Sequence, residues 1–333
     1  MRNLVTVIIL VAGLIACASK SDSDSYFEDT EAPETNIFFG DPSITLANGT
    51  YYMYGTGPES DTGIKVFRSD DLENWIGPVG PNQGFALHED DVFGDHFFWA
   101  PEVYEVEGKY YMFYSVQEHM AIATSDDPEG PFVQDDDSGY LEEFNAIDHH
   151  LYIDEDGTKY LYFAKFEDGL EIWVAEMNDD MSGIHQETMI EALSQSQDWE
   201  KSQKEPVGRV NEGPYVIKHE GMYYMIYSGN HYASPDYGIG LAYAEDPMGP
   251  WTKDENNPIL QNPDSLVGTG HSAFFRDKQD ELYMVYHAHN STEEVHPRKA
   301  YFNPIIFKEV EGENRFTMEV QAPRSEAKAR PAN

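Results

Sequence analysis

A short pattern, a turn followed by a tyrosine-rich apolar strand, occurs five times along the 333 residues of this chain. This repeat restricts the possible folds more than any other feature, because each copy must form one unit of a repetitive architecture. The copies are centred on Met53, Met112, Leu161, Met225 and Met284, at spacings of 59, 49, 64 and 59 residues. Units of this length are typical of single blades of a β-propeller.

Each copy is preceded by a second apolar segment, so the turn between them predicts a β-hairpin. These partner segments are residues 42–46, 101–106, 150–153, 214–218 and 272–276. We therefore predict an all-β fold, a five-bladed β-propeller in a single domain. A β-sandwich is the alternative, but it gives no reason for repeats of this length. One or two helical turns are expected within Thr188–Ser196.

The residues 12 or 13 positions before the repeat centres mark the start of each first strand. They are Asp41, Trp99 or Ala100, Asp148, Glu212 and His271. The first strands of a propeller line its central channel, so these side chains should meet at one mouth of that channel. Carboxylates held together shift one another's pKa, and glycoside hydrolysis needs one neutral carboxylic acid and one ionised carboxylate. The pattern therefore predicts a glycosidase active site.

The sequences around these positions resemble, in their order along the chain, the blade-start motifs of glycoside hydrolase family 43. The matching motifs are Asp41-Pro42-Ser43, Trp99-Ala100-Pro101-Glu102, Ile147-Asp148, Glu212-Gly213-Pro214 and Gly270-His271-Ser272. The resemblance runs from about Phe39 to about Phe307. It implies an inverting, five-bladed propeller enzyme of the β-xylosidase or α-L-arabinofuranosidase type.

The same resemblance implies a role for each residue. Asp41 would be the general base, Glu212 the general acid, and Asp148 the third carboxylate, which raises the pKa of the acid and orients it. His271 matches a channel histidine that contacts a bound calcium ion, directly or through water. Arg298 is the nearest match to an arginine at the rim of the active site. The chemistry itself would need no cofactor, and the calcium ion would be structural.

The charge of the chain limits its partners. The sequence has 61 Asp and Glu against 21 Lys and Arg, a formal net charge of -40, and so offers no positive surface for the phosphates of nucleic acid. Its 22 Tyr, 18 Phe and 5 Trp supply enough apolar surface for a folded core despite that charge. We expect the partner to be a carbohydrate and not nucleic acid. We expect the protein to be a monomer.

The predicted function is an inverting, exo-acting glycosidase that releases xylose, arabinofuranose or galactose-type sugars from plant or algal polysaccharides or oligosaccharides. Trp99 is interpreted either as a platform on which a sugar ring stacks or as part of the core. Two alternatives stay open. One is a surface glycan-binding propeller without catalytic activity. The other is a propeller enzyme of another reaction, such as a retaining fructosidase or a polysaccharide lyase.

The N-terminal segment predicts export and a lipid anchor. A charged start and an apolar run lead to Leu14-Ile15-Ala16-Cys17, which resembles a bacterial lipobox; an ordinary signal peptide with an incidental cysteine is the alternative. We expect a signal peptide over residues 1–16, a lipidated Cys17 with a flexible tether over 17–34, the propeller over 35–320 and a disordered tail over 321–333. The protein would lie at the bacterial outer membrane or cell surface, with the periplasmic side as an option, and would contact the membrane only through this anchor.

Overall fold

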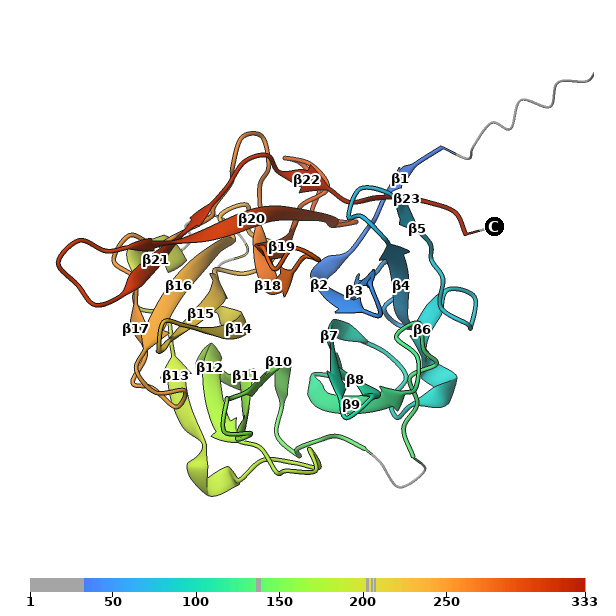
Figure 1. Ribbon diagram of the computed structural model, residues 1–333, viewed down its shortest axis with the longest axis horizontal. Helices are drawn as coiled ribbons and strands as arrows, with labels where there is room; N and C mark the ends of the chain where they lie inside the picture. The colour runs from blue at the N-terminus through green and yellow to red at the C-terminus, as the bar shows by residue number, and fades with distance from the viewer. Residues whose placement is uncertain (1–32, 136–138, 202–203, 205, 207, 333) are drawn as a thin grey trace, which may run out of the picture. The chain divides into compact units, whose positions relative to one another are not determined.

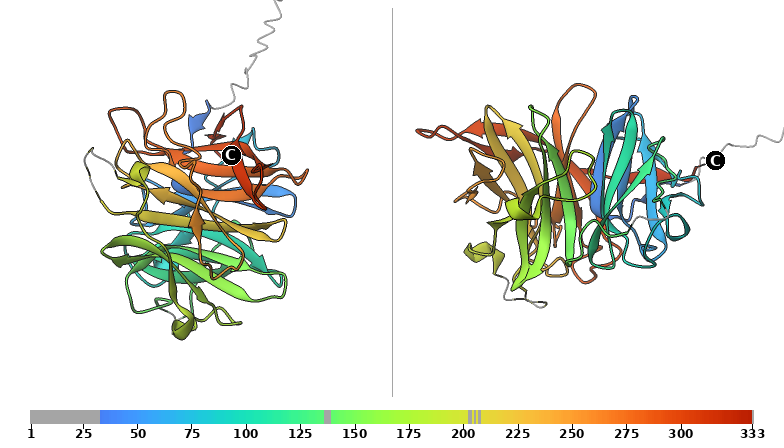
Figure 2. Two further views of the ribbon diagram at one scale, coloured as in Figure 1. Left: turned by 90° about the vertical axis from the view of Figure 1, so that its left-hand side faces the viewer. Right: turned by 90° about the horizontal axis from the view of Figure 1, so that it is seen from below.

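Regular structure in this protein is almost entirely β-strand. The structure, a computed structural model, describes residues 33–332 apart from 136–138, 202–203, 205 and 207. Pro33–Asn333 forms one compact unit. Within this unit the strands are grouped, in chain order, into sheets arranged around a common centre (Figure 1). The right-hand view of Figure 2 shows that many strands run along the axis of this arrangement.

The first and second sheets come from the N-terminal part of the unit. The first contains β2 (Gly40–Ala47), β3 (Thr50–Thr56), β4 (Gly63–Ser69) and β5 (Trp75–Ile76), with β6 (Phe85–His88) paired to β4. The second contains β7 (Trp99–Val106), β8 (Lys109–Val116) and β9 (His119–Ser125). A 3₁₀ helix, η1 (Glu89–Asp91), lies between them in the chain.

In the remaining three sheets, most strands that are consecutive in the chain also pair with each other. The third contains β10 (Ala146–Ile153), β11 (Lys159–Glu167), β12 (Gly169–Glu176) and β13 (Ile190–Leu193). The fourth contains β14 (Asn211–His219), β15 (Met222–Gly229), β16 (Gly238–Ala244) and β17 (Thr252–Lys253). The fifth contains β18 (Gly270–Arg276), β19 (Leu282–Ala288), β20 (Lys299–Glu309), β21 (Phe316–Val320) and β22 (Ser325–Glu326). Two 3₁₀ helices, η2 (Gln186–Thr188) and η3 (Asp198–Glu200), precede β14.

These strands confirm an all-β fold with a propeller arrangement. The prediction of a five-bladed propeller is confirmed only in part, because the sheets differ in size and do not form five clearly closed blades. Among the described residues the second sheet has three strands, whereas the first has seven, since it takes in strands from both ends of the unit.

The core lies between neighbouring sheets. The five repeat centres lie on the second strand of their sheets, and each is 2 % exposed or less. The buried apolar residues form clusters that each join two consecutive sheets: Tyr54 on β3 with Val103 on β7, for example, and Ala273 on β18 with Met53 on β3. The repeated tyrosine-rich strand is therefore the part of each unit that packs against its neighbours.

Two sequence-based expectations are wrong. The disordered tail predicted over 321–333 contains regular structure in its described part: β23 (Lys328–Arg330) pairs antiparallel with β1 (Thr35–Asn36) and parallel with β5 (Figure 1). The buried methyl groups of Ala327 and Ala329 hold this segment in the core. Thr188–Ser196 is not helical beyond the end of η2, because Ile190–Leu193 adds a fourth strand to the third sheet.

The predicted signal peptide, Cys17 and nearly all of the tether lie outside the described residues. Within the part of the chain that the structure describes, we find no helix long and apolar enough to cross a membrane.

Candidate active site

The same β-bulge interrupts the first strand of every sheet. Strand pairing is irregular between residues 40 and 43, 99 and 102, 147 and 150, 212 and 215, and 270 and 273. One residue in each bulge has a positive φ: Asp41 (49°), Ala100 (45°), Asp148 (58°), Gly213 (56°) and His271 (46°). This backbone conformation is costly for residues other than glycine and often occurs at functional sites. The bulges therefore mark one equivalent position in each of the five sheets.

The strand register shows that the predicted site residues occupy two different positions, which their spacing in the sequence did not distinguish. Asp41, Asp148 and His271 lie within the bulge, but Glu212 lies one residue before it. The residues equivalent to Glu212 are Gly40, Trp99, Ile147 and Gly270. The spacing could not show this difference, because the hairpin turns differ in length.

All the predicted site residues of the propeller line one cavity of about 550 Å³. They are Asp41, Trp99, Asp148, Glu212, His271 and Arg298. The three carboxylates come from the first, third and fourth sheets, and each is less than a tenth exposed. Asp41 and Arg298 lie 257 positions apart in the sequence, and the fold brings them into contact. The sequence analysis had assigned both to the same site.

Asp41 is held in its ionised form. Arg298 donates two hydrogen bonds to its carboxylate, at 2.7 and 2.9 Å, and Thr56 donates a third at 2.6 Å. Burial alone would raise the pKa of Asp41, but the positive charge of Arg298, with smaller contributions from His271 and His287, holds it well below its usual range. This carboxylate therefore accepts protons rather than donating them.

Glu212 and Asp148 behave in the opposite way. Burial raises the pKa of Glu212 to about 7, although the Tyr237 hydroxyl donates to its Oε1 at 2.8 Å and favours the ionised form. Burial, followed by the charges of Glu212 and Asp41, also raises the pKa of Asp148 well above its usual range. The cavity thus contains one ionised carboxylate and a pair that retains a proton near neutral pH.

His271 lies between the two kinds of carboxylate. Its Nδ1 is 3.3 Å from Asp41 Oδ1 and 3.8 Å from Asp148 Oδ2. Burial lowers the pKa of the imidazole. Across the described residues, no group of three or more His, Cys, Asp or Glu side chains is placed to hold a metal ion. Calcium prefers six to eight oxygen ligands, and the side chains around His271 do not by themselves supply that number. The calcium contact of His271 stays a prediction.

Trp99 is partly exposed and contributes to the cavity wall. Its ring stacks on Phe97, with centroids 4.6 Å apart and an angle of 24° between the planes. Because one neighbour supports the indole and part of it faces the cavity, the geometry favours the platform over the core interpretation.

Several residues of the site escaped the sequence analysis. Thr56 and Tyr232 line the cavity. The Tyr237 hydroxyl donates to the Glu212 carboxylate, and His287 Nδ1 accepts from the backbone N–H of Asp41. Thr56 and His287 occupy equivalent positions, since each pairs with the residue just before the bulge of its own sheet. A search for polar residues at the ends of the repeated strands would have found both.

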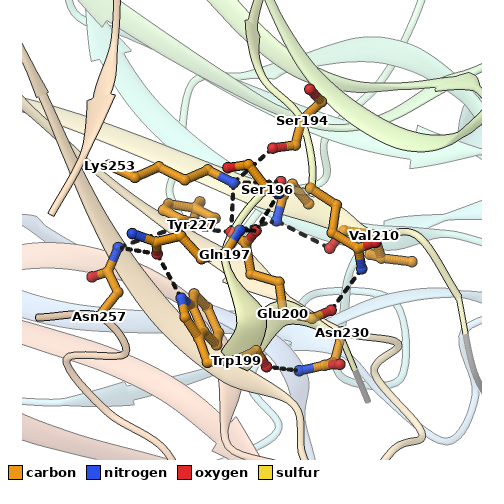
Figure 3. A network of polar contacts seen from close by, with 12 residues as sticks. Ser194, Ser196, Gln197, Trp199, Glu200, Val210, Tyr227, Asn230, Lys253 and Asn257 are labelled. Atoms are coloured by element: carbon orange, nitrogen blue, oxygen red, sulfur yellow. Dashed lines mark hydrogen bonds and ion pairs between the residues drawn. The ribbon is translucent and has the colours of Figure 1, made fainter. Parts of the chain in front are cut away.

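A buried ion pair fixes the strand that carries Glu212 (Figure 3). Glu200 is fully buried and accepts hydrogen bonds from Lys253 Nζ at 2.5 Å and from the Tyr227 hydroxyl at 2.8 Å. Asn211 donates to Glu200 at 3.2 Å and accepts from Lys253 at 3.0 Å. Because Asn211 directly precedes Glu212, this network holds the backbone on one side of the predicted acid.

Comparison with known proteins agrees with this geometry. A family model described as glycosyl hydrolases family 43 matches residues 31–309. The chain belongs to this family. A solved structure described as endo-1,4-beta-xylanase from Bacteroides thetaiotaomicron is 40% identical, with a TM-score of 0.81, and the match covers 91% of this chain and 100% of that one. A second, described as a thermostable family-43 glycoside hydrolase, is 34% identical, with a TM-score of 0.74 and coverage of 92% and 99%.

The curated relatives that the chain matches have lower sequence identity. A β-D-galactofuranosidase of Aspergillus niger is 26% identical over 75% of this chain and 74% of its own length. An extracellular exo-α-(1→5)-L-arabinofuranosidase of Cellvibrio japonicus is 24% identical over 76% of this chain and 79% of its own length. As a family 43 member the protein is a glycoside hydrolase, which confirms the predicted enzyme class.

Proposed function

We propose that this protein is an inverting glycosidase in which Glu212 is the general acid, Asp41 the general base and Asp148 the residue that tunes the acid. The observation that carries this assignment is the division of three buried carboxylates in one cavity into an ionised one and a proton-retaining pair. That division is what acid–base cleavage of a glycosidic bond requires.

The proposed reaction is a single displacement. Glu212 gives its proton to the glycosidic oxygen as the bond to the anomeric carbon breaks. A water molecule attacks the opposite face of the sugar ring, and Asp41 takes the proton that this water loses. Arg298 and Thr56 orient both oxygens of Asp41 toward this task. Burial and the negative charge of Asp41 raise the pKa of the acid, and Asp148, when ionised beside it, would raise it further by like-charge repulsion.

The substrate we propose is a terminal xylose, arabinofuranose or galactose-type sugar of a plant or algal glycan. Relatives described as xylanase, arabinofuranosidase and galactofuranosidase support this range. A cavity of about 550 Å³ has the size of a small-ligand site, which favours a chain end over a long internal stretch. Trp99 would contact the apolar face of the sugar.

Substitution of the two principal residues tests the assignment. Glu212→Gln and Asp41→Asn should each lower kcat by at least about 10²-fold, because each removes one half of general acid–base catalysis. Activity is measured on a panel of aryl xylosides, arabinofuranosides and galactosides, with circular dichroism as the control for folding. A folded variant with near-wild-type turnover would overturn the assignment.

The stereochemistry of the product gives an independent test. Proton NMR early in the reaction should show the inverted anomer. A retained anomer would favour a fructosidase-like enzyme, and binding of a glycan without release of sugar would favour a glycan-binding propeller.

The finer description of the fold is also a proposal. We propose five blades, each built on one of the five hairpins. The five equivalent bulges and the five core clusters between consecutive sheets support this number.

We also propose that Cys17 carries a lipid and places the enzyme at the outer membrane or cell surface. The support is the sequence Leu14-Ile15-Ala16-Cys17. Cys17→Ala should move the enzyme from the membrane fraction to the soluble fraction on cell fractionation, because the acyl chains supply the attachment. A variant that stayed with the membrane would contradict this anchor.

A further inference from the structure

A ring of hydrogen bonds, complete at four of the five bulges, ties each bulge to the preceding sheet. In four of them, the backbone N–H of the bulge residue donates to a side chain on the second strand of the preceding sheet. These bonds run from Asp41 to His287 Nδ1 (3.1 Å), from Ala100 to Thr56 Oγ1 (3.0 Å), from Asp148 to Ser115 Oγ (3.0 Å) and from His271 to Ser228 Oγ (2.7 Å). The accepting side chains occupy equivalent positions, each paired with the residue before the bulge of its own sheet.

The ring is interrupted at the third sheet. The equivalent position there is Ala164, which pairs with Ile147 and is fully buried. A methyl group cannot accept a hydrogen bond. The Gly213 N–H, which would donate to this position, donates instead to Asp148 Oδ2 at 3.3 Å. The one break in the ring therefore connects the Asp148 carboxylate to the peptide that directly follows Glu212.

We propose that Ala164 is a positioning residue whose lack of an acceptor leaves the Gly213 N–H to Asp148. This inference rests on the proposed function, since it explains how Asp148 is held beside the general acid.

The Gly213 N–H acts among several charges that face Asp148. Glu212 approaches from β14, Asp41 from β2, His271 from β18, and Arg298 from the segment before β20. The two carboxylates disfavour the ionised form of Asp148, while Arg298 and the Gly213 N–H favour it. Loss of this hydrogen bond would make Asp148 harder to ionise and would reduce its repulsion of Glu212.

A hydroxyl at position 164 should compete for the Gly213 N–H. At the equivalent positions Ser115 and Ser228 accept at 3.0 and 2.7 Å, which is shorter than the 3.3 Å contact with Asp148. Ala164→Ser adds one oxygen atom to a side chain that two other sheets accommodate as serine. Ala164→Cys adds similar volume with a poor acceptor and is the matched control.

A double-mutant cycle on stability tests the competition without any activity measurement. In Asp148→Ala the Gly213 N–H has lost its acceptor, so Ala164→Ser should raise the Tm by about 2 °C or more in that background. In the otherwise wild-type protein Ala164→Ser should give no such gain, because Asp148 already accepts. Equal effects in the two backgrounds, or the same rescue by Ala164→Cys, would overturn the proposal.

Amide exchange provides a measurement without a substitution at position 164. In Asp148→Ala, exchange of the Gly213 amide should accelerate relative to the Ala100 and His271 amides, which keep their acceptors. Unchanged relative exchange would overturn the assigned contact.

The pH profile tests the consequence for the acid. In Ala164→Ser the alkaline limb of kcat/KM should move to lower pH, because a less ionised Asp148 lowers the pKa of Glu212, and in Ala164→Cys it should stay in place. A limb that did not move would overturn the positioning role. If the wild-type protein hydrolysed no glycoside, the proposed function would fail, while the stability cycle would still report on the contact.

Discussion

At the scale of single residues, we expect the Tyr237 hydroxyl to lower the upper pH limit of activity. It donates to Glu212 and favours the ionised form of that carboxylate. Tyr237→Phe removes this donor, so the pKa of Glu212 should rise above about 7 and the protonated acid should persist to higher pH. We expect the alkaline limb of kcat/KM to move upward.

The matched control for this prediction is Tyr162→Phe. Tyr162 is equally buried, but its hydroxyl donates to the Pro247 carbonyl, away from the cavity. A downward movement of the limb in Tyr237→Phe, or an equal upward movement in Tyr162→Phe, would show that the hydroxyl does not act through Glu212.

Residues whose distance from a repeat centre is constant could be predicted from sequence. Asp41, Asp148 and His271 were found in this way, and Glu212 was placed within one position. Arg298 was found through the order of family motifs, but its two bonds to Asp41 were not foreseen. Thr56 and His287 each lie three residues after a repeat centre and were missed because only the residues before the centres were compared. Tyr237 was missed because it has no equivalent in the repeated strand pattern.

At the scale of elements, the ion pair of Glu200 and Lys253 holds η3 against the fourth sheet. Lys253→Met leaves the Glu200 charge buried without its partner, so we expect a loss of about 3 to 5 kcal/mol in the free energy of unfolding. Turnover should fall as well, because Asn211 in this network precedes Glu212. Urea denaturation and kcat on the best substrate measure the two effects.

An exposed ion pair supplies the comparison. Lys201→Met breaks the contact with Asp198. Both side chains are exposed, so the free energy of unfolding should stay nearly unchanged. Glu200→Gln combined with Lys253→Met should recover part of the stability. Similar losses for the buried and the exposed variant would contradict a structural role for the network.

Hairpins were easier to predict than the irregularities within them. The repeated turn and apolar strand identified the second strand of every sheet, since burial on both sides leaves a continuous apolar run. The bulges were invisible, because neither Asp41 nor Ala100 belongs to a residue type that demands a positive φ. The strand at Ile190–Leu193 was missed because only its pairing with β12 makes it extended.

At the scale of the whole molecule, the C-terminal segment joins the two ends of the described unit. β23 lies between β1 and β5, and Ala327 and Ala329 are buried beside it. Removal of residues 322–333 should expose the edge of β5 and this part of the core. We expect the Tm to fall by about 2–4 °C for each kcal/mol lost, as measured by differential scanning calorimetry.

Removal of residues 331–333 alone is the control, because β23 ends at Arg330. A full truncation with an unchanged Tm would show that the terminal pairing contributes nothing to stability. Sequence could not predict this pairing, since the segment Ser325–Arg330 is short and mostly polar.

The five bulges also bear on how such proteins diverge. One backbone conformation carries a carboxylate, a methyl group, a second carboxylate, a bare glycine and an imidazole at equivalent places in the five sheets, and both carboxylates and the imidazole line the cavity. Each of these groups belongs to a single residue in an otherwise similar hairpin. Point substitution at these places can therefore change the reactive groups of the enzyme without any insertion, deletion or rearrangement of the framework, and a combinatorial library over so few positions samples much of that chemistry.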